Sequence, residues 1–268
     1  MKSIRVVAAI IKDKDKILAM RRSYGEFKNG WEFPGGKVEL GEDKEKALIR
    51  EIKEEMNANL IIERFFTSIE YSYPNFHMIM DCYICTIDDF QIKKEVHDEA
   101  RWLSKKDLDT VEWLAADVKV VNKLKIYLSE NIAVSACLLG DNCKYNGKNN
   151  YNEEVIKAIA NKKVIKICPE LLTGLPVPRN PVEISNNRII SKDGKDLTEI
   201  FYQGVDKAWE ILKDKNIDLA ILKANSPSCG SGKIYDGTFS HKLINGYGIF
   251  AKLLSNKGIL VISEQDLV

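Results

Sequence analysis

The fold of the first half of this protein is decided by residues 31–58, which read WEFPGGKVELGEDKEKALIREIKEEMNA. The stretch opens with a loop signal, Pro34-Gly35-Gly36, in which Gly36 permits unusual backbone angles. A helix is predicted to follow over residues 43–56. Its apolar face, which anchors it to the rest of the domain, consists of Leu48, Ile52 and Met56.

The same helix carries a dense acidic face. Three carboxylates stand at positions i, i+3 and i+4, namely Glu51, Glu54 and Glu55. Like charges at this spacing repel one another, so the face is costly unless a cation neutralises it. Mg²⁺ is suited to the role, because it binds one or two protein carboxylates together with substrate phosphates. For the three glutamates alone, a solvated acidic helix face is an alternative of equal standing.

A wider pattern around this helix resembles the Nudix box: Gly, five residues, Glu, seven residues, then Arg-Glu-aliphatic-x-Glu-Glu. The matching residues are Gly36, Glu42, Arg50, Glu51, Ile52, Glu54 and Glu55. The resemblance is to the MutT-like branch of the Nudix hydrolases, over residues 3–128, and includes the Arg21-Arg22 pair. Asn57 stands where the box has Gly, and we expect the fold to survive because Asn is the next best residue for a left-handed helix end.

The resemblance implies an α+β fold, a mixed sheet between helices, and hydrolysis of a nucleoside triphosphate-like substrate with Mg²⁺ or Mn²⁺. Water would attack a phosphorus while the metal neutralises charge on the phosphate oxygens, giving a nucleoside monophosphate and pyrophosphate. The implied metal ligands are the Gly36 carbonyl, Glu51, Glu54 and Glu55.

Supporting roles follow from the same resemblance. Glu51 would bind metal or help to activate water, Arg50 would orient Glu51 by an ion pair, and Glu42 would close the loop. Arg22 is expected to contact the substrate. A further carboxylate, Glu95 or Glu99, is expected to join from a later loop.

Asp117 is the candidate for base recognition, because Trp113-Leu114-Ala115-Ala116-Asp117 resembles the segment where MutT-like enzymes place Asn or Asp against the base. An ionised Asp only accepts hydrogen bonds, so we expect a preference for bases that present an amino or imino N–H, as in cytosine, adenine or guanine forms. A helix N-terminal Asp favoured by the dipole is the alternative. We interpret the histidines as isolated and assign none to metal: His77, His97 and His241.

A second domain is predicted after Ser129-Glu130-Asn131, which gives domains over residues 1–128 and 131–268. In the second domain, short buried-type strands alternate with helices. The expected elements are strands at Ile132–Ala136, Val164–Ile167, Leu219–Lys223 and Gly258–Ser263, and helices at 153–161 and 198–213. This βα alternation predicts an α/β domain with a parallel sheet covered on both faces.

Three cysteines follow predicted strands of the second domain: Cys137, Cys168 and Cys229. Parallel α/β sheets bind ligands at the carboxyl ends of their strands, so we expect these thiols to converge there. Thiolates select zinc or iron–sulfur clusters, and structural zinc sites want four ligands in close pairs, which this half lacks. Three thiolates on a 4Fe–4S cluster would leave one iron open. Cys143 is the possible fourth ligand, and buried structural cysteines are the alternative.

Four segments of this half resemble the thiouracil desulfurases: VSACLLGDNCKYNG (134–147), KICPELLTGLPVPRNPVEI (166–184), GKDLTEIF (194–201) and SPSCGSGKIYDGTFS (226–240). The resemblance covers residues 131–268 and implies a Rossmann-like fold. It also implies a 4Fe–4S cluster held by Cys137, Cys168 and Cys229, whose open iron takes the sulfur of a thiolated pyrimidine while water supplies the replacing oxygen.

Four polar residues of these motifs are candidates for substrate or proton handling. Arg179 lies in a proline-stiffened loop and could hold an anionic or carbonyl group, Glu170 could move protons, and Ser226 and Ser228 could hydrogen-bond the cluster or substrate. A surface arginine, turn chemistry and a helix cap are the alternatives.

Whole-chain composition limits the partners. The chain has 268 residues with 40 basic and 39 acidic side chains, which favours small molecules, nucleotides and thiolated pyrimidines, over long nucleic acid. No apolar run approaches 18 residues, so we expect no membrane span. The first residues read as a strand rather than a signal peptide, which predicts a cytoplasmic protein with reduced cysteines.

The sequence therefore predicts a bifunctional enzyme, a Nudix pyrophosphohydrolase joined to an iron–sulfur desulfurase, with a shared role in sanitation or salvage of modified nucleotides. Two alternatives stay open. The second half could be a zinc-stabilised binding module without chemistry, or it could act on thiolated bases within tRNA.

Overall fold

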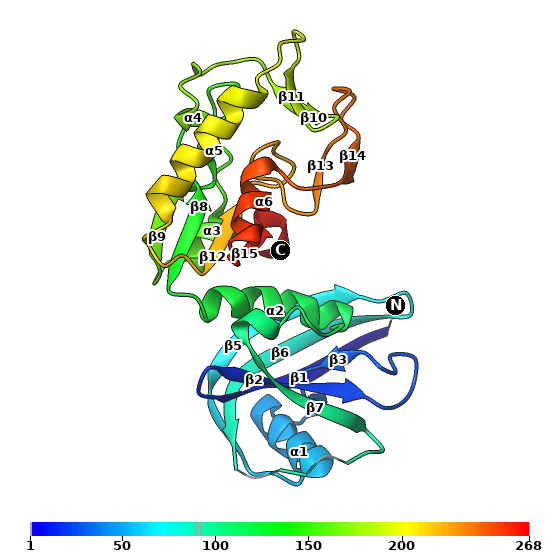
Figure 1. Cartoon of the computed structure of the whole chain (residues 1–268). Coiled ribbons are helices and arrows are strands. Elements are labelled where there is room, and N and C mark those ends of the chain that lie inside the picture. The colour runs from blue at the N-terminus through cyan, green and yellow to red at the C-terminus, as the bar shows by residue number, and fades with distance from the viewer. Residues whose placement is uncertain (1, 89, 92, 268) are drawn as a thin grey trace. The chain divides into compact units, whose positions relative to one another are not determined.

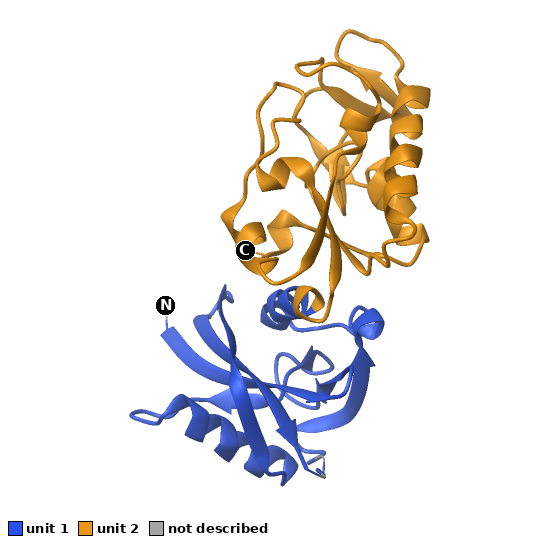
Figure 2. Ribbon diagram, turned by 90° about the vertical axis from the view of Figure 1, so that its left-hand side faces the viewer, with its two compact units in different colours: residues 1–124 blue, residues 125–268 orange. Residues whose placement is uncertain are grey.

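The chain divides into two compact units, residues 1–124 and 125–268, in a computed structural model that describes residues 2–88, 90–91 and 93–267 (Figures 1 and 2). The division falls inside helix α2 (Ala115–Tyr127). Within the described part of the chain, no helix is long and apolar enough to cross a membrane.

The first unit is built on one mixed sheet. Its elements are β1 (Lys2–Asp13), β2 (Lys16–Arg22), β3 (Trp31–Glu32), β4 (Gly35–Lys37), α1 (Lys44–Met56), β5 (Leu60–Ser72), β6 (Phe76–Ile87), β7 (His97–Ser104), a 3₁₀ turn at Lys105–Asp107, and α2. The main strand order is β3-β2-β1-β6-β5, with β4 paired to β1 and β7 paired to β2. Strand β1 is parallel to β6 and antiparallel to β2 and β4, so the predicted α+β class with a mixed sheet is confirmed.

Helix α1 forms where the apolar spacing predicts it. Asp43 caps its start by accepting hydrogen bonds from the backbone N–H groups of Glu45 and Lys46 at 3.0 and 3.2 Å. Asn57 ends it in the left-handed conformation, with φ 50°, and donates its N–H to the Lys53 carbonyl at 3.1 Å. The substitution of Asn for the usual Gly therefore leaves a normal helix end, as expected.

The second unit is built on a parallel sheet. Its strands are β8 (Asn131–Ser135), β9 (Lys163–Ile167), β12 (Leu219–Leu222) and β15 (Leu260–Ser263), in the order β15-β12-β8-β9. Every pairing between them is parallel, which confirms the predicted α/β class. The other elements are two 3₁₀ turns (Ala136–Leu139 and Glu264–Leu267), helices α3 (Glu153–Ala158), α4 (Pro169–Leu172), α5 (Thr198–Leu212) and α6 (Ile249–Asn256), and hairpins β10 (Val182–Ser185)–β11 (Arg188–Ser191) and β13 (Lys233–Tyr235)–β14 (Leu243–Asn245).

Both faces of this sheet are buried, because successive strand residues enter two different cores. Along β12, Ala220 and Leu222 pack with α5 and α6, whereas Leu219 and Ile221 pack with α3 and the C-terminal 3₁₀ turn. The strands read as continuous apolar runs for this reason. Their carboxyl ends are left free to hold a site.

Candidate active sites

The loop before α1 brings the Gly36 backbone against the helix carboxylates. Gly36 pairs with Val7 of β1, and a methyl group on it would overlap the Glu51 carboxylate. A methyl group on Gly35 would overlap the Val7 carbonyl, and its φ of 151° also favours glycine. The two glycines are therefore required by close packing, which sets the Gly36 carbonyl near the acidic face of α1.

Arg50 ties the loop to the helix. It donates to both carboxylate oxygens of Glu42, each at 2.9 Å, and to Glu51 Oε1 at 2.9 Å. Its Nη2 also donates to the Lys37 carbonyl at 3.1 Å. The hydrogen bonds from Arg50 lower the pKa of Glu42 to about 2, so this ion pair persists through the neutral range. The structure thus brings together the three residues expected to close the loop and orient Glu51.

Glu54 and Glu55 differ in their surroundings. The Glu54 side chain is 59% exposed, while that of Glu55 is 14% exposed and its Oε2 is buried without a hydrogen-bond partner. Burial raises the pKa of Glu55 to about 7. Among the described residues, no group of three His, Cys, Asp or Glu side chains is arranged closely enough to coordinate one metal ion. The donor set still fits Mg²⁺, because a buried carboxylate oxygen without a hydrogen-bond partner, beside other hard oxygen donors, is a ligand that a divalent cation would satisfy.

The neighbours of Glu55 are residues that sequence reasoning missed. Glu32 and His97 lie beside it, and Glu32 is held in turn by Arg22. The interpretation of His97 as isolated is therefore wrong. Arg22, predicted to contact substrate, has its guanidinium paired with Glu32 at 2.9 and 3.0 Å, and its substrate role stays a prediction.

The two candidates for the additional carboxylate have different surroundings, and the role of either stays a prediction. Glu95 is exposed, and Glu99 forms ion pairs with Arg21 at 2.9 Å and Arg101 at 2.6 Å. The charges that act on Glu55 come from His97, Glu32, Glu51 and Arg22. A burial signal was available for Glu32, because it stands between Trp31 and Phe33 at the start of the box.

Asp117 lies in the first turn of α2, where it is buried and accepts a hydrogen bond from the Phe33 N–H at 3.0 Å. Burial raises the pKa of Asp117 to about 8. This raised pKa runs against the expectation of an ionised, acceptor-only side chain at neutral pH. A protonated carboxyl donates one hydrogen bond and still accepts others.

The raised pKa of Asp117 predicts a pH-dependent stability. A carboxyl whose folded pKa exceeds its unfolded value of about 4 contributes stability that is lost as pH rises from about 4 to about 8. Asp117→Asn stays neutral, so at pH 8.5 we expect its melting temperature to exceed that of the wild type by roughly 3 °C or more, since one pKa unit is about 1.4 kcal/mol. The difference should shrink as pH falls and vanish near pH 4. Thermal unfolding over pH 4–9, with the exposed Asp15→Asn as control, tests this, and equal profiles would contradict it.

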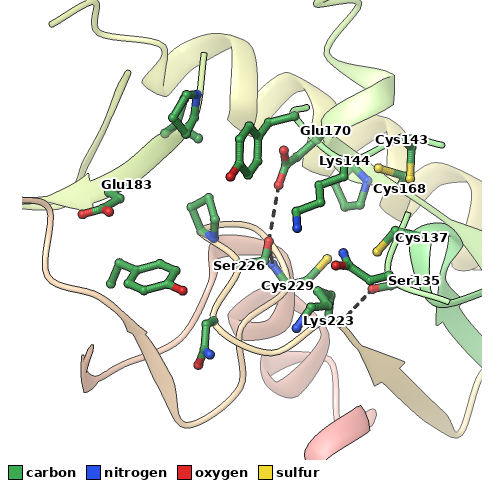
Figure 3. A pocket seen from close by; sticks show the side chains of 18 of the residues that line it. Ser135, Cys137, Cys143, Lys144, Cys168, Glu170, Glu183, Lys223, Ser226 and Cys229 are labelled. Atoms are coloured by element: carbon green, nitrogen blue, oxygen red, sulfur yellow. Dashed lines mark hydrogen bonds between the residues drawn. The ribbon is translucent and has the colours of Figure 1, made fainter. Parts of the chain in front are cut away.

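The second unit has a cavity of about 790 Å³ at the carboxyl edge of its sheet (Figure 3). Its walls include strand ends, the first 3₁₀ turn and residues of both hairpins. Cysteines reach it from three separate strand ends, and the described free thiols on its wall are Cys137, Cys143, Cys168 and Cys229. The convergence expected from the strand-end positions is therefore present.

Cys143 contacts two of the other thiols. A hydrogen bond from the Cys143 thiol lowers the pKa of Cys137 to about 7, and the same kind of bond lowers the pKa of Cys168. Burial raises the pKa of Cys229. Soft thiols gathered from separate elements on one enclosed cavity are a donor set that fits an iron–sulfur cluster, in which each thiolate meets a different iron.

Glu170 is the centre of a polar network beside these thiols. It forms an ion pair with Arg179, whose side chain is 6% exposed, and its Oε1 accepts from the hydroxyls of Ser226 at 3.3 Å and Ser228 at 3.4 Å. The Ser226 Oγ also accepts from the Cys229 N–H at 3.0 Å. The four polar residues selected from the motifs are thus brought together, with the Arg179 guanidinium facing Glu170.

The buried pair predicts a large effect of removing one partner. Arg179→Ala leaves the Glu170 carboxylate uncompensated, which costs about 3–5 kcal/mol in buried pairs, so we expect the melting temperature of the second unit to fall by roughly 10 °C. Arg188→Ala is the matched control, because its ion pair with Asp196 is exposed and worth about 1 kcal/mol or less. Equal shifts in calorimetry would contradict the prediction.

The far end of the cavity contains residues that sequence reasoning missed. Figure 3 shows Glu183 at the end opposite Cys137 and Cys168, with Lys144 pointing into the space between. The Glu183 Oε2 accepts from the N–H groups of Gly237 and Phe239, both at 3.0 Å, and so fixes the loop between β13 and β14. Phe239 adopts a φ of 59°, a conformation that other contacts must hold in place. The available signal was that Lys144 and Glu183 both lie within the motif segments quoted above, 134–147 and 166–184.

Comparison with known proteins covers each half separately. The family described as NUDIX domain matches residues 1–124, and the family described as 2-thiouracil desulfurase matches residues 132–266. In the first half, the 8-oxo-dGTP diphosphatase of Escherichia coli is 27% identical over 127 residues, 47% of this chain and 98% of its own length. The CTP pyrophosphohydrolase of Escherichia coli is 31% identical over 124 residues, 45% of this chain and 90% of its own.

For the second half, the YbbK protein of Bacillus subtilis is 44% identical over 146 residues, 51% of this chain and 97% of its own length. A solved structure of the 4Fe–4S-dependent thiouracil desulfidase TudS is 37% identical, with a TM-score of 0.48. The match covers 52% of this chain and 93% of that one.

Proposed function

Because this chain belongs to the NUDIX family through residues 1–124 and to the 2-thiouracil desulfurase family through residues 132–266, we propose that it is a bifunctional enzyme. Its Nudix domain, residues 1–128, hydrolyses a nucleoside triphosphate or a diphosphate derivative with Mg²⁺. Its second domain, residues 131–268, removes sulfur from a thiolated pyrimidine base or nucleoside. The observation that carries the second activity is the convergence of thiols from three strand ends on one cavity beside Glu170.

In the hydrolase, the metal would be held by the Gly36 carbonyl, Glu51, Glu54 and Glu55. It would neutralise charge on the phosphate oxygens and lower the pKa of a bound water. Arg50 keeps one Glu51 oxygen in a fixed direction by its 2.9 Å hydrogen bond, while Glu42 anchors the guanidinium from the other side. The second Glu51 oxygen is then oriented to accept a proton from the attacking water.

Base recognition falls to Asp117. With its pKa raised to about 8, its carboxyl holds a proton at neutral pH and donates to a carbonyl or thiocarbonyl on the base while accepting the Phe33 N–H. A donating carboxyl extends the expected substrates to bases that present a carbonyl or thiocarbonyl. Thiolated uracil nucleotides are then admissible substrates of the Nudix domain, which would let the two domains share a salvage role.

In the desulfurase, Cys137, Cys168 and Cys229 would hold a 4Fe–4S cluster, which supplies an iron without a protein ligand for the substrate sulfur. Arg179 forms an ion pair with one oxygen of Glu170. The other oxygen, Oε1, faces the hydroxyls of Ser226 and Ser228 and takes the proton of the water that replaces sulfur. Cys143, which forms hydrogen bonds with the Cys137 and Cys168 thiols, is assigned as a neighbour of the cluster rather than a ligand.

Protein purified without oxygen tests the desulfurase directly. We expect a broad visible absorption band, about four irons and four sulfides per chain, and turnover of 2-thiouracil to uracil. A colourless protein that stays iron-free after anaerobic reconstitution, and holds about one zinc on its cysteines, would contradict the activity and support a structural module.

Steady-state hydrolysis tests the first domain and its link to the second. A panel of ordinary, oxidised and thiolated nucleoside triphosphates is assayed with Mg²⁺, and thiouridine triphosphate is expected to rank among the better substrates. Slower turnover of the thio-compound than of ordinary nucleotides would contradict a common substrate while leaving the hydrolase itself intact.

A further inference from the structure

Strand β7 contains a bulge that changes which side chains face the interior of the first unit. Arg21 lies opposite Glu99 and Arg22 opposite His97, so Asp98 is an extra residue on β7. An extra residue reverses the alternation of the strand and re-aims the side chain beyond it. His97 and Arg22 therefore point to the same face, and His97 is 1% exposed.

Glu32 joins these two side chains. Arg22 donates to both of its oxygens at 2.9 and 3.0 Å, and His97 Nε2 lies 3.0 Å from Oε1. A carboxylate paired with arginine only accepts hydrogen bonds, so Nε2 of His97 carries the hydrogen. The imidazole is thus fixed in position by a part-buried ion pair.

The second imidazole nitrogen faces the box. His97 Nδ1 lies 3.9 Å from Glu55 Oε2, and both atoms are buried without a hydrogen-bond partner within the described structure. The backbone holds the two residues in this relation, because the Lys93 N–H donates to the Glu55 carbonyl at 3.3 Å and the His97 N–H donates to the Lys93 carbonyl at 3.0 Å. The imidazole ring therefore lies directly beside the buried Oε2 of Glu55 and is held there by backbone hydrogen bonds.

We infer that His97, held by Glu32 and Arg22, is a positioning residue for Glu55: it fixes the side-chain conformation in which Glu55 meets a divalent cation. The inference rests on the proposed hydrolase function. Outer partners of metal-binding carboxylates characteristically contribute 10- to 100-fold in metal affinity or activity. The His97 ring occupies the position of such a partner, because it is buried, held by Glu32 and lies 3.9 Å from the Glu55 oxygen.

Two amide substitutions each keep one ring-nitrogen position of His97 and remove the other. In His97→Gln the amide can reach the place of Nε2 and keep the bond to Glu32, and in His97→Asn it can reach the place of Nδ1 and lose that bond. Both are measured by Mn²⁺ binding to the nucleotide-free protein, followed by electron paramagnetic resonance, and by the Mg²⁺ concentration for half-maximal hydrolysis. In each variant we expect the Mn²⁺ affinity to fall, and the Mg²⁺ concentration for half-maximal hydrolysis to rise, by about 10-fold or more. The value of kcat at saturating Mg²⁺ should change less.

The matched control is Asp98→Asn, which alters an exposed ion pair with Arg21 on the same strand and should leave metal binding within about twofold. A lower melting temperature with unchanged Mn²⁺ affinity in both His97 variants would overturn the inference, since a purely structural role predicts that result. If the His97 variants do not fold, Glu32→Gln carries the same test. A wild type that binds Mn²⁺ but hydrolyses no nucleotide would refute the proposed function alone.

Discussion

Replacing Cys137, Cys168 or Cys229 by serine is expected to lower bound iron to a small fraction of one cluster per chain and to reduce 2-thiouracil turnover by about 100-fold or more. The three thiols enter one cavity from three strand ends, and serine offers a hard, poorly ionised oxygen in place of a soft thiolate. Loss of a cluster ligand should exceed the 10- to 100-fold cost seen when a hydrogen-bond partner of a metal ligand is lost. Iron analysis, absorbance and turnover of anaerobically purified protein measure the effect.

Cys143→Ser distinguishes a ligand from a neighbour. Cys143 contacts Cys137 and Cys168, and as a non-ligand its replacement should keep the cluster content close to that of the wild type. Full iron content in Cys229→Ser together with loss in Cys143→Ser would contradict the proposed ligand set. Nucleotide hydrolysis by each variant serves as an internal control, because these cysteines lie in the second unit.

Glu55→Gln is expected to reduce kcat/KM for nucleoside triphosphate hydrolysis by about 100-fold or more while raising thermal stability. The amide keeps the shape of the side chain but removes a charged metal ligand, and loss of such a ligand should cost more than loss of an outer partner. Burial raises the pKa of Glu55 to about 7, so ionisation of the folded protein is unfavourable and stability falls as pH rises from about 4 to about 7. A neutral side chain avoids that loss.

The expected loss of activity and gain of thermal stability have opposite signs, so a variant that is merely misfolded cannot produce both. Thermal unfolding at pH 8 without metal should show a higher melting temperature for Glu55→Gln than for the wild type. Glu45→Gln, an exposed glutamate in the first turn of the same helix at a position that the box leaves unspecified, is the control and should leave both quantities nearly unchanged. A variant that is both active and no more stable would contradict the assigned role of Glu55.

Local pattern was sufficient for the elements. The spacing of Leu48, Ile52 and Met56 predicts helix α1, and the structure confirms it to within a residue, including its left-handed end at Asn57. The βα alternation after residue 131 likewise predicts a parallel sheet, because only strands buried on both faces read as short continuous apolar runs. Placement of cysteines at three strand ends followed from that topology, since parallel strands end at one edge.

Long-range contacts were not predictable in the same way. The motif selected Arg179, Glu170 and the two serines separately, but the pairing of the arginine with Glu170, nine residues before it, depends on how the loop between them folds. The burial that gives Asp117 its pKa of about 8 is likewise supplied by other parts of the first unit.

By itself, the sequence determined the two domains' fold classes, the box on α1 and the thiols at the sheet edge, because periodicity, caps and strand ends are encoded by neighbouring residues. Only the tertiary structure decided which polar groups are buried and against what. A single extra residue, Asp98, turns His97 inward toward Glu32 and Glu55, and neither that contact nor the desolvation that raises the pKa of Glu55 can be read from residues far apart in the chain. Desolvation and long-range pairing are properties of packed neighbours, so they exist only once the chain has folded.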